Sequence, residues 1–418
     1  MTFSTLELCD SLDKSISNQG FTQPTPIQLA AIPPMVQGRD LVGTAHTGSG
    51  KTLAFALAVL QRLAATPDQS PRRLNTLVVV PTRELCAQVG AEIRKLSLGL
   101  PRPIRIAVVF GGVSINPQLL RLRGGADIVV ATPGRLLDLV AHNALQLGTV
   151  RTCVLDEADR LLALGFADEL GQIMRLLPVE RQTILFSATF AAPVHALSTQ
   201  ILRDPVCIDV RASAETLPNI VHRAFAVDAD RRTQLLRHLV EANHWSRVLV
   251  FVATTHGADM LARKLRKAGI GAEAFHGDLS QGKRNQVLSD FKACRIAVVA
   301  ATDLAARGLD IAQLPAVVNF DLPRSAVDYV HRAGRTGRAG EPGTAVSFVS
   351  EPTNAHFKLI VKRQQLDLRL EVLAEFLPSA AAPHPAQTPP TVDPIGGIKG
   401  RRPNKKDKLR AKLGGPLR

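Results

Sequence analysis

The 418-residue chain is 45% hydrophobic and has a formal net charge of +15, which predicts two or three domains with apolar cores and favours a polyanionic partner. It has no apolar run near the roughly 18 residues of a membrane span and no signal-peptide pattern, so we expect a cytoplasmic protein without a membrane partner. Its five scattered cysteines include no Cys-x-x-Cys pair, which argues against disulfides and against a zinc site.

A polar, proline-bearing stretch that includes Phe21 and Gln28 precedes the first predicted strand. A glutamine amide can donate and accept hydrogen bonds at once, so Gln28 could recognise the N6/N7 edge of an adenine on which Phe21 stacks. On these residues alone, a turn with a core phenylalanine is the stronger interpretation.

The next segment has the strand, glycine-bearing loop and helix of a phosphate-binding loop. Apolar Leu41-Val42 precedes the loop, and residues 53–60 predict a helix. Glycines allow the backbone to turn tightly around an anion, and the N–H groups at the helix start attract polyphosphate. Lys51 would reach the β- and γ-phosphates, and Thr52 would join the shell of a Mg²⁺ ion. The alternative is a chance Gly/Ser/Thr loop. The predicted ATP-binding residues here are Ala45, His46, Thr47, Gly48, Ser49, Gly50, Lys51 and Thr52.

An acidic cluster, Asp156-Glu157-Ala158-Asp159, follows another apolar run. It would lie at the carboxyl end of a strand, where ligands bind in open α/β sheets. Asp156 is suited to hold Mg²⁺, directly or through water, and Glu157 to polarise an attacking water. Alone, such a cluster more often marks a solvated corner. Together with the upstream phosphate loop, it predicts nucleotide hydrolysis.

Predicted strands alternate with helical patterns through both halves of the chain, which indicates an α/β fold with parallel sheets covered on both faces. The strand-like runs are 77–80, 104–109, 127–130, 152–155, 183–186, 223–227, 248–252, 296–300, 316–320 and 344–348. We expect one domain at 1–207, a linker at 208–219, a second domain at 220–375, and a Pro/Ala-rich then basic disordered tail at 376–418. No second glycine-rich Lys-Thr loop appears, so the two domains would share one nucleotide site.

The second domain holds a segment, 329–338, that is dense in arginine beside glycine and includes Arg335 and Arg338. Guanidinium groups aimed at a γ-phosphate would stabilise the charge of phosphoryl transfer. A basic loop that binds nucleic acid alone is the alternative.

In this order the motifs resemble the DEAD-box ATP-dependent RNA helicases, whose name residues 156–159 spell, over about residues 3–349. The phrase at 111–117, Gly-Gly-Val-Ser-Ile-Asn-Pro, looks most like the bacterial RhlE-type branch. The resemblance implies two RecA-like domains, ATP and Mg²⁺ as cofactors, and RNA-stimulated ATP hydrolysis. Three positions depart from the family pattern: Ala45, His46 and Ala333.

The resemblance also assigns roles that the residues alone leave open. It places Phe21 and Gln28 in the adenine-reading Q motif, which reverses the interpretation of this stretch as a turn with a core phenylalanine. It also makes Arg335 and Arg338 arginine fingers. It implies further ATP contacts at Gly308 and Asp310. The implied coupling residues are Asp159, Ser187, Thr189, Arg307, His331 and Arg332. The implied RNA contacts are Pro81, Thr82, Arg83, Gly111, Gly112, Thr132, Pro133, Gly134, Arg135, Thr254, Gln281, Arg284 and Thr302. Such side chains and helix starts suit phosphate contact, although each could equally be a helix cap.

The implied mechanism is closure of the two domains around ATP and RNA, which locally separates short duplexes or remodels RNA–protein complexes. We expect a monomer that binds RNA with little sequence specificity, and ribosomal precursors or the RNA-decay machinery as its setting. Residues 399–418 hold nine basic residues and one acid, which favours further contact with RNA phosphates over a solvated tail. Two alternatives remain open: a DNA helicase or translocase, and a non-unwinding RNA-binding clamp, scaffold or annealing factor.

Overall fold

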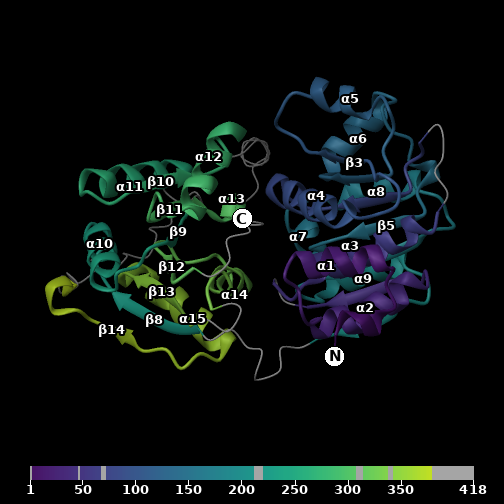
Figure 1. The fold of residues 1–418 in the computed structure, drawn as a ribbon. Coiled ribbons are helices and arrows are strands. Elements are labelled where there is room, and N and C mark those ends of the chain that lie inside the picture. The colour runs from purple at the N-terminus through teal and green to yellow at the C-terminus, as the bar shows by residue number, and fades with distance from the viewer. Residues whose placement is uncertain are drawn as a thin grey trace, which may run out of the picture.

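Two parallel seven-stranded sheets, one in each half of the chain, organise the computed structural model (Figure 1). The structure describes residues 2–45, 48–66, 72–210, 220–306, 314–337 and 342–378. Strand order is β3-β4-β2-β5-β6-β1-β7 in the first sheet and β10-β11-β9-β12-β13-β8-β14 in the second. This confirms the predicted α/β fold with two RecA-like halves.

The first half contains η1 (Phe3–Leu6), α1 (Asp10–Asn18), α2 (Pro26–Val36), β1 (Leu41–Thr44), α3 (Lys51–Ala64), β2 (Thr76–Val79), α4 (Arg83–Ser97), β3 (Ile106–Val109), α5 (Asn116–Leu122), β4 (Ile128–Ala131), α6 (Pro133–Ala141), η2 (Leu147–Thr149), β5 (Thr152–Leu155), α7 (Ala158–Ala163), α8 (Ala167–Leu176), β6 (Gln182–Ser187), α9 (Ala192–Ile201) and β7 (Val206–Asp209). The second half contains β8 (Ile220–Ala226), α10 (Arg232–Ala242), β9 (Val248–Val252), α11 (Thr255–Lys267), β10 (Ala272–Phe275), α12 (Gln281–Lys292), β11 (Val298–Thr302), α13 (Asp303–Ala306), β12 (Ala316–Asn319), α14 (Ala326–Ala333), β13 (Gly343–Val349), η3 (Glu351–Thr353), α15 (Asn354–Gln364), β14 (Leu370–Glu371) and η4 (Ala374–Phe376).

The central strands are buried on both faces because helices pack on each side of the sheets. In the first half, α1 to α4 cover one face and α6 to α9 the other. Alternate residues of one strand therefore enter different cores: Val78 of β2 packs with α3 and α4, and Leu77 with the opposite helices. In the second half, α10 and α11 cover one face, and α12 and α13 the other.

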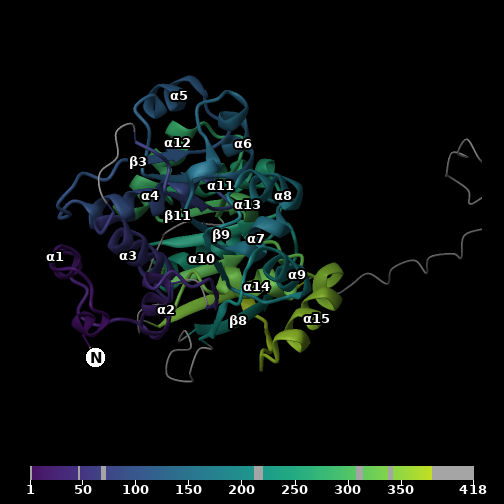
Figure 2. The ribbon, with the colours of Figure 1, turned by 90° about the vertical axis from the view of Figure 1, so that its right-hand side faces the viewer.

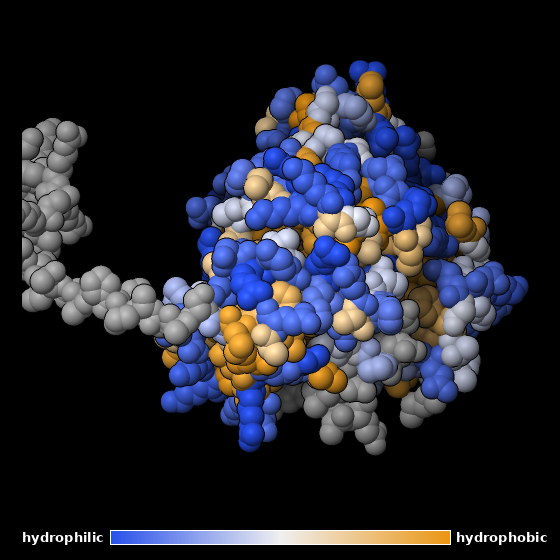
Figure 3. All heavy atoms as spheres, turned by 90° about the vertical axis from the view of Figure 1, so that its left-hand side faces the viewer, coloured by the Kyte–Doolittle hydropathy of each residue, from blue (hydrophilic) through white to orange (hydrophobic). Residues whose placement is uncertain are grey.

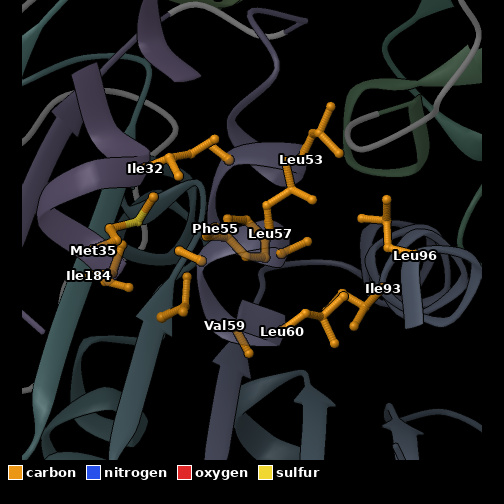
Figure 4. Packing of buried hydrophobic residues seen from close by; sticks show 14 of the residues in the cluster. Ile32, Met35, Leu53, Phe55, Leu57, Val59, Leu60, Ile93, Leu96 and Ile184 are labelled. Carbon is orange, nitrogen blue, oxygen red and sulfur yellow. The ribbon is translucent and has the colours of Figure 1, made fainter. Parts of the chain in front are cut away.

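Helix α3 is the centre of the first core, which explains why its apolar run is nearly continuous. Its residues 53–60 are all buried. Figure 4 shows Phe55 and Leu57 of this helix between Met35 of α2 and Ile93 of α4. Packing on several sides fixes the start of α3, which carries the predicted phosphate loop.

Three short strands escaped the sequence prediction, and all of them lie at a sheet edge. β7 and β14 are partly exposed, so they lack the continuous apolar run of a central strand. β10 contains two alanines and a glutamate, a weak strand pattern. Conversely, the predicted strand at 104–109 forms only over Ile106–Val109, also at an edge.

Exposed surface is mostly hydrophilic on the outer face of the second half, apart from a cluster of hydrophobic side chains low on that face (Figure 3). Exposed large hydrophobic residues near the end of the described chain include Leu370, Val372 and Leu377. In the part of the chain that the structure describes, no helix combines the length and apolarity needed to span a bilayer.

Replacement of Gly43 by alanine is expected to destabilise the first half. A Cβ at Gly43 of β1 would lie 2.4 Å from a ring carbon of Phe186 in the adjacent strand β6. Overpacking of this kind costs about 1–3 kcal/mol, which lowers a melting midpoint by several degrees. The matched control is Gly148→Ala, where a Cβ would meet no atom within 4 Å. Equal melting shifts for the two variants would contradict the packing described here.

Candidate functional site

Sheet topology brings three of the predicted loops together at the carboxyl edge of the first sheet. Strand β6 lies between β1 and β5, so the loop after β6 separates the phosphate loop from the acidic cluster. The backbone N–H of Ala45 donates to the Ser187 carbonyl at 3.1 Å. This bond joins the phosphate loop to the end of β6, where the next loop begins. The acidic cluster is fixed by Asp156, whose N–H donates to the Val79 carbonyl at 3.1 Å.

The phosphate loop leads directly into α3. Gly50 is the N-cap residue of α3 and has φ +94°, a conformation that favours glycine. Lys51 is only 7% exposed, and its Nζ donates to the Ala45 carbonyl at 2.5 Å. The ammonium group therefore lies across the loop, where a bound polyphosphate would meet it. Thr52 is half-buried in the first turn of α3.

Gln28 supports this loop through both ends of its amide. Its Oε1 accepts from the Thr25 N–H at 2.9 Å, and its Nε2 donates to the Gly50 carbonyl at 3.1 Å. The Thr25 hydroxyl also donates to the Ser49 carbonyl at 2.8 Å. A Cβ on Gly50 would approach Gln28 Nε2 to 2.3 Å, so only glycine fits. Phe21, by contrast, is 41% exposed and leaves its ring accessible.

Asp156 and Glu157 are both buried at the end of β5. Burial, reinforced by the Glu157 charge and opposed by Lys51, raises the pKa of Asp156 to about 7. A carboxylate in such a place is stabilised by a cation. Glu157 has φ +53° as N-cap of α7, and its Oε2 lies 2.6 Å from Arg160 Nη1. Among the described residues, no group of three His, Cys, Asp or Glu side chains could form a metal site by itself.

The loop after β6 contacts the acidic cluster through the hydroxyl group of Thr189. Thr189 Oγ1 donates to Asp159 Oδ2 at 3.1 Å, and Ser187 Oγ donates to the Thr189 carbonyl at 2.7 Å. The second carboxylate oxygen of Asp159 is buried without a hydrogen-bond partner. The structure thus brings the predicted coupling residues Asp159, Ser187 and Thr189 together.

The arginine-bearing helix α14 of the second half faces this cluster across a small pocket. Arg160 of the first half and His331, Arg332 and Arg335 of the second half line it. Burial and then the Arg160 charge lower the pKa of His331, while Asp159 opposes that shift. Arg335 is only 5% exposed.

Arg332 is held entirely by its own half. Its guanidinium contacts both carboxylate oxygens of Asp303, at 2.6 and 2.7 Å, and donates to Asn319 Oδ1 at 2.9 Å. It also lies 4.8 Å over the ring of Phe251. Arg332 therefore fixes α14 against the ends of β11 and β12 and so positions its neighbours.

Several predicted RNA contacts of the first half gather beside the ends of β2, β3 and β4. Pro81 is buried and Thr82 caps α4, with its Oγ1 accepting from the Leu85 N–H at 3.3 Å. The Gly111 N–H donates to Thr132 Oγ1 at 3.3 Å, and Arg135 Nη2 donates to the Val113 carbonyl at 2.7 Å.

Gly112 and Gly134 are two further predicted RNA contacts of the first half, and their surroundings differ. Gly112 has φ +71°, and a Cβ there would overlap the Arg83 guanidinium. Pro133 and Gly134 begin α6, and Gly134 has open space where a Cβ would stand. Gly134 thus leaves room for a partner to approach the backbone closely.

The second half contributes residues at the starts of two helices and the end of one strand. Thr254 caps α11, accepting from the Gly257 N–H at 3.0 Å, and Thr302 ends β11. Gln281 begins α12, and its Oε1 is buried without a hydrogen-bond partner. Arg284 Nη2 of α12 lies 2.6 Å from Glu84 Oε1 of α4, so this ion pair joins the two halves.

Six predicted site residues lie outside the described residues: His46, Thr47, Arg307, Gly308, Asp310 and Arg338. Three residues that matter to the geometry were not predicted: Glu84, Arg160 and Asp303. Each directly follows a predicted site residue, Arg83, Asp159 and Thr302 respectively. A charged residue next to a predicted site residue indicates a further member of the site, although sequence alone does not reveal its distant partner.

Comparisons with known proteins agree with this geometry. Residues 25–197 match the DEAD/DEAH box helicase family, and residues 231–340 match the helicase conserved C-terminal domain. The DEAD-box ATP-dependent RNA helicase CshA of Bacillus cereus is 41% identical over 86% of this chain and 67% of its own length. This chain belongs to the DEAD-box ATP-dependent RNA helicase family. The resemblance inferred from the motifs is therefore confirmed at family level, and the relatives compared do not decide the RhlE-type branch.

Two solved structures of this family differ in how well they superpose on the whole chain. Saccharomyces cerevisiae Dbp5 bound to RNA and ADP BeF3 is 29% identical, with a TM-score of 0.78 over 89% of this chain and 95% of that one. A DEAD box protein from Methanococcus jannaschii is 34% identical, yet its TM-score is 0.51 over 89% of this chain and 99% of that one. This chain therefore superposes better on the RNA- and ADP BeF3-bound Dbp5 than on the M. jannaschii protein.

Proposed function

We propose that this DEAD-box helicase is an RNA clamp closed by ATP, which separates short RNA duplexes locally or remodels RNA–protein complexes. The observation that carries the proposal is the pocket in which Arg160 of one half meets His331 and Arg335 of the other. Phosphoryl transfer needs a metal-binding carboxylate, a group that orients water, and cationic groups on the γ-phosphate. In this chain those groups are divided between the two halves, so hydrolysis requires closure.

The ATP site is proposed to use the phosphate loop, the Q motif and the acidic cluster. Phe21 would stack on the adenine, and Lys51 would bind the β- and γ-phosphates. Thr52 and Asp156 fit a Mg²⁺ ion because one buried carboxylate and one hydroxyl suit a metal that also takes phosphate oxygens and water. That ion would neutralise charge on the phosphates, and Glu157 would orient the attacking water.

Gln28 has a second proposed task besides recognition of adenine. Both ends of its amide already bond the backbone at Thr25 and Gly50. An adenine at Gln28 would therefore compete for the amide that holds the Gly50 carbonyl. We propose that this exchange links base recognition to the shape of the phosphate loop.

RNA is proposed to bind across both halves through its backbone. The candidate residues are helix caps, glycines and arginines near the strand ends, which suit phosphate and 2′-OH contacts and read no base. Such contacts explain low sequence specificity and a preference for RNA. A strand bent to follow both halves would not fit a duplex, and this local bending would separate the strands.

The overlays on two solved structures support closure as the active state. The overlay on RNA- and ADP BeF3-bound Dbp5 is better than that on the more identical M. jannaschii protein. A ligand favours the form for which it has the higher affinity, so ATP and RNA that each touch both halves would favour the same closed form.

ATP turnover with and without RNA tests this proposal. Steady-state ATPase activity should rise on addition of single-stranded RNA and stay near its basal rate with DNA of the same sequence. Stimulation by DNA as strong as that by RNA would favour a DNA helicase or translocase. Activity that ignores both nucleic acids would favour a non-unwinding clamp, scaffold or annealing factor.

The ion pair between Glu84 and Arg284 predicts a coupled effect on the closed form. Both side chains are at most 8% exposed, and loss of either partner leaves a buried charge uncompensated. Glu84→Gln and Arg284→Gln should each weaken RNA binding in the presence of a non-hydrolysable ATP analogue by about tenfold or more. The double variant should bind no more weakly than the single ones, because the interaction is lost once and no buried charge remains unpaired. Additive losses in the double-mutant cycle would show that the pair does not act across the cleft.

Finer assignments extend this proposal. We propose domains at 1–207 and 220–375, with a linker at 208–219 and a Pro/Ala-rich then basic tail at 376–418, although β7 extends to Asp209. The phrase at 111–117 supports the RhlE-type branch. We further propose a cytoplasmic monomer that acts on ribosomal precursors or in RNA decay, with the tail adding non-specific phosphate contacts.

A further inference from the structure

A groove of about 550 Å³ lies at the open edge of the first sheet, outside the ATP site. Edge strand β3 forms its floor, α4 one wall and α5 the other. Figures 1 and 2 both place α5 at the upper end of the first half, with β3 and α4 beneath it. The lining residues are Ala87, Arg94, Val108, Phe110, Val113, Ser114, Pro117, Gln118 and Arg121.

The lining combines apolar surface with positive charge. Val108, Phe110 and Pro117 supply the apolar part. The two charged residues of the lining, Arg94 on α4 and Arg121 on α5, are both exposed arginines, and the described lining contains no aspartate or glutamate. An aromatic and apolar floor between two guanidinium groups suits a ligand with flat rings and phosphates, such as single-stranded nucleic acid.

The groove opens directly onto the proposed RNA path. Val113 and Ser114 line it and immediately follow Gly111-Gly112 in the chain. Arg135, another proposed RNA contact, donates to the Val113 carbonyl at 2.7 Å. A strand held at these residues would therefore leave the cleft at the mouth of the groove.

Gln118 makes the floor of the groove a fixed surface. It is 6% exposed, its Oε1 accepts from the Phe110 N–H at 3.1 Å, and its Nε2 donates to the Phe110 carbonyl at 3.1 Å. These two bonds occupy the free edge of the backbone where β3 ends. They also discourage an added peptide strand, which would need the same backbone groups.

We propose that this groove binds the nucleotides of the RNA strand that leave the cleft next to Gly111-Gly112. Arg94 and Arg121 contact phosphates, and a base lies against Phe110 and Pro117. The inference rests on the proposed function, because it assumes that RNA occupies the residues at the end of β3. It gives the enzyme a single-strand contact beyond the nucleotides that trigger hydrolysis.

RNA length separates this inference from the proposed function. Affinity is measured by fluorescence anisotropy with a non-hydrolysable ATP analogue, for a short RNA that fills only the cleft and for RNAs extended on the 5′ or the 3′ side. The wild-type chain should bind one extended RNA more tightly than the short one. Arg94→Gln/Arg121→Gln should remove most of that gain, so the extended RNA should bind about tenfold more weakly than to the wild type. The slope of log affinity against log salt concentration should become shallower by roughly 0.7 for each arginine.

Controls make the result decisive. Arg175→Gln, an exposed arginine on α8 on the other face of the sheet, should keep the gain. Phe110→Leu retains apolar packing, so it should lose only the part of the affinity gain that comes from base stacking on the Phe110 ring. ATPase stimulation by the short RNA should be unchanged in all variants.

Two outcomes would overturn the inference: an unchanged gain in Arg94→Gln/Arg121→Gln, or an equal loss in Arg175→Gln. An unchanged gain would leave the groove to another ligand, such as an acidic peptide. Failure of the short RNA to stimulate the wild-type enzyme would instead overturn the proposed function.

Discussion

Glu157→Gln is expected to lower RNA-stimulated ATP turnover by about 10²–10⁴-fold while binding of ATP and RNA persists. The carboxylate is proposed to orient and deprotonate the attacking water, and an amide of the same shape cannot accept that proton. Because glutamine keeps the length of the side chain, it should tolerate the positive φ at this N-cap as glutamate does. The measurement is steady-state ATPase activity with saturating RNA, together with RNA affinity in the presence of ATP.

The matched control is Glu169→Gln on α8, which changes a glutamate outside the proposed site. It should retain wild-type turnover. If Glu157→Gln keeps more than about a tenth of the wild-type rate, another group activates the water. If it loses ATP binding as well, Glu157 holds the site together through Arg160 Nη1, 2.6 Å from its Oε2.

Arg335→Lys is expected to lower kcat by about 10³–10⁵-fold, since an arginine finger stabilises charge that appears only in the transition state. Lysine keeps the positive charge but lacks the planar fork of donors that meets two phosphate oxygens. ATP affinity should therefore change little. Arg335 is buried beside α14, so a melting curve must first establish that the variant is folded.

Arg363→Lys, an exposed position on α15, is the matched control and should be silent. Single-turnover kinetics separate the chemical step from product release. A kcat within tenfold of wild type for folded Arg335→Lys would place the transition-state charge elsewhere in the site.

Much of the fold could be predicted because the buried strands and the loops after them carry strong local signals. Val78 and Val130 lie in strands buried on both faces, which gives the continuous apolar pattern. The chemistry at Lys51 and Asp156 follows the same logic, because parallel strands end at one edge.

Contacts between distant segments could not be predicted in the same way. Nothing near Glu84 in sequence indicates that Arg284, in the other half, lies 2.6 Å from its carboxylate. The bond of Gln28 to Gly50 depends on how α2 meets the phosphate loop, a question of packing. The edge strand β7 has alternating exposure and ends in Asp209, so its short pattern resembles that of a loop.

The central claim is that ATP and RNA favour one closed form, and reciprocal binding tests it most directly. RNA affinity is measured with and without a non-hydrolysable ATP analogue, and affinity for the analogue with and without RNA. Linkage requires that the nucleotide analogue tighten RNA binding by the same factor by which RNA tightens binding of the analogue, and we expect a factor of about 5 to 150. Equal RNA affinity with and without the nucleotide would contradict the account, because the two ligands would then not share a closed state.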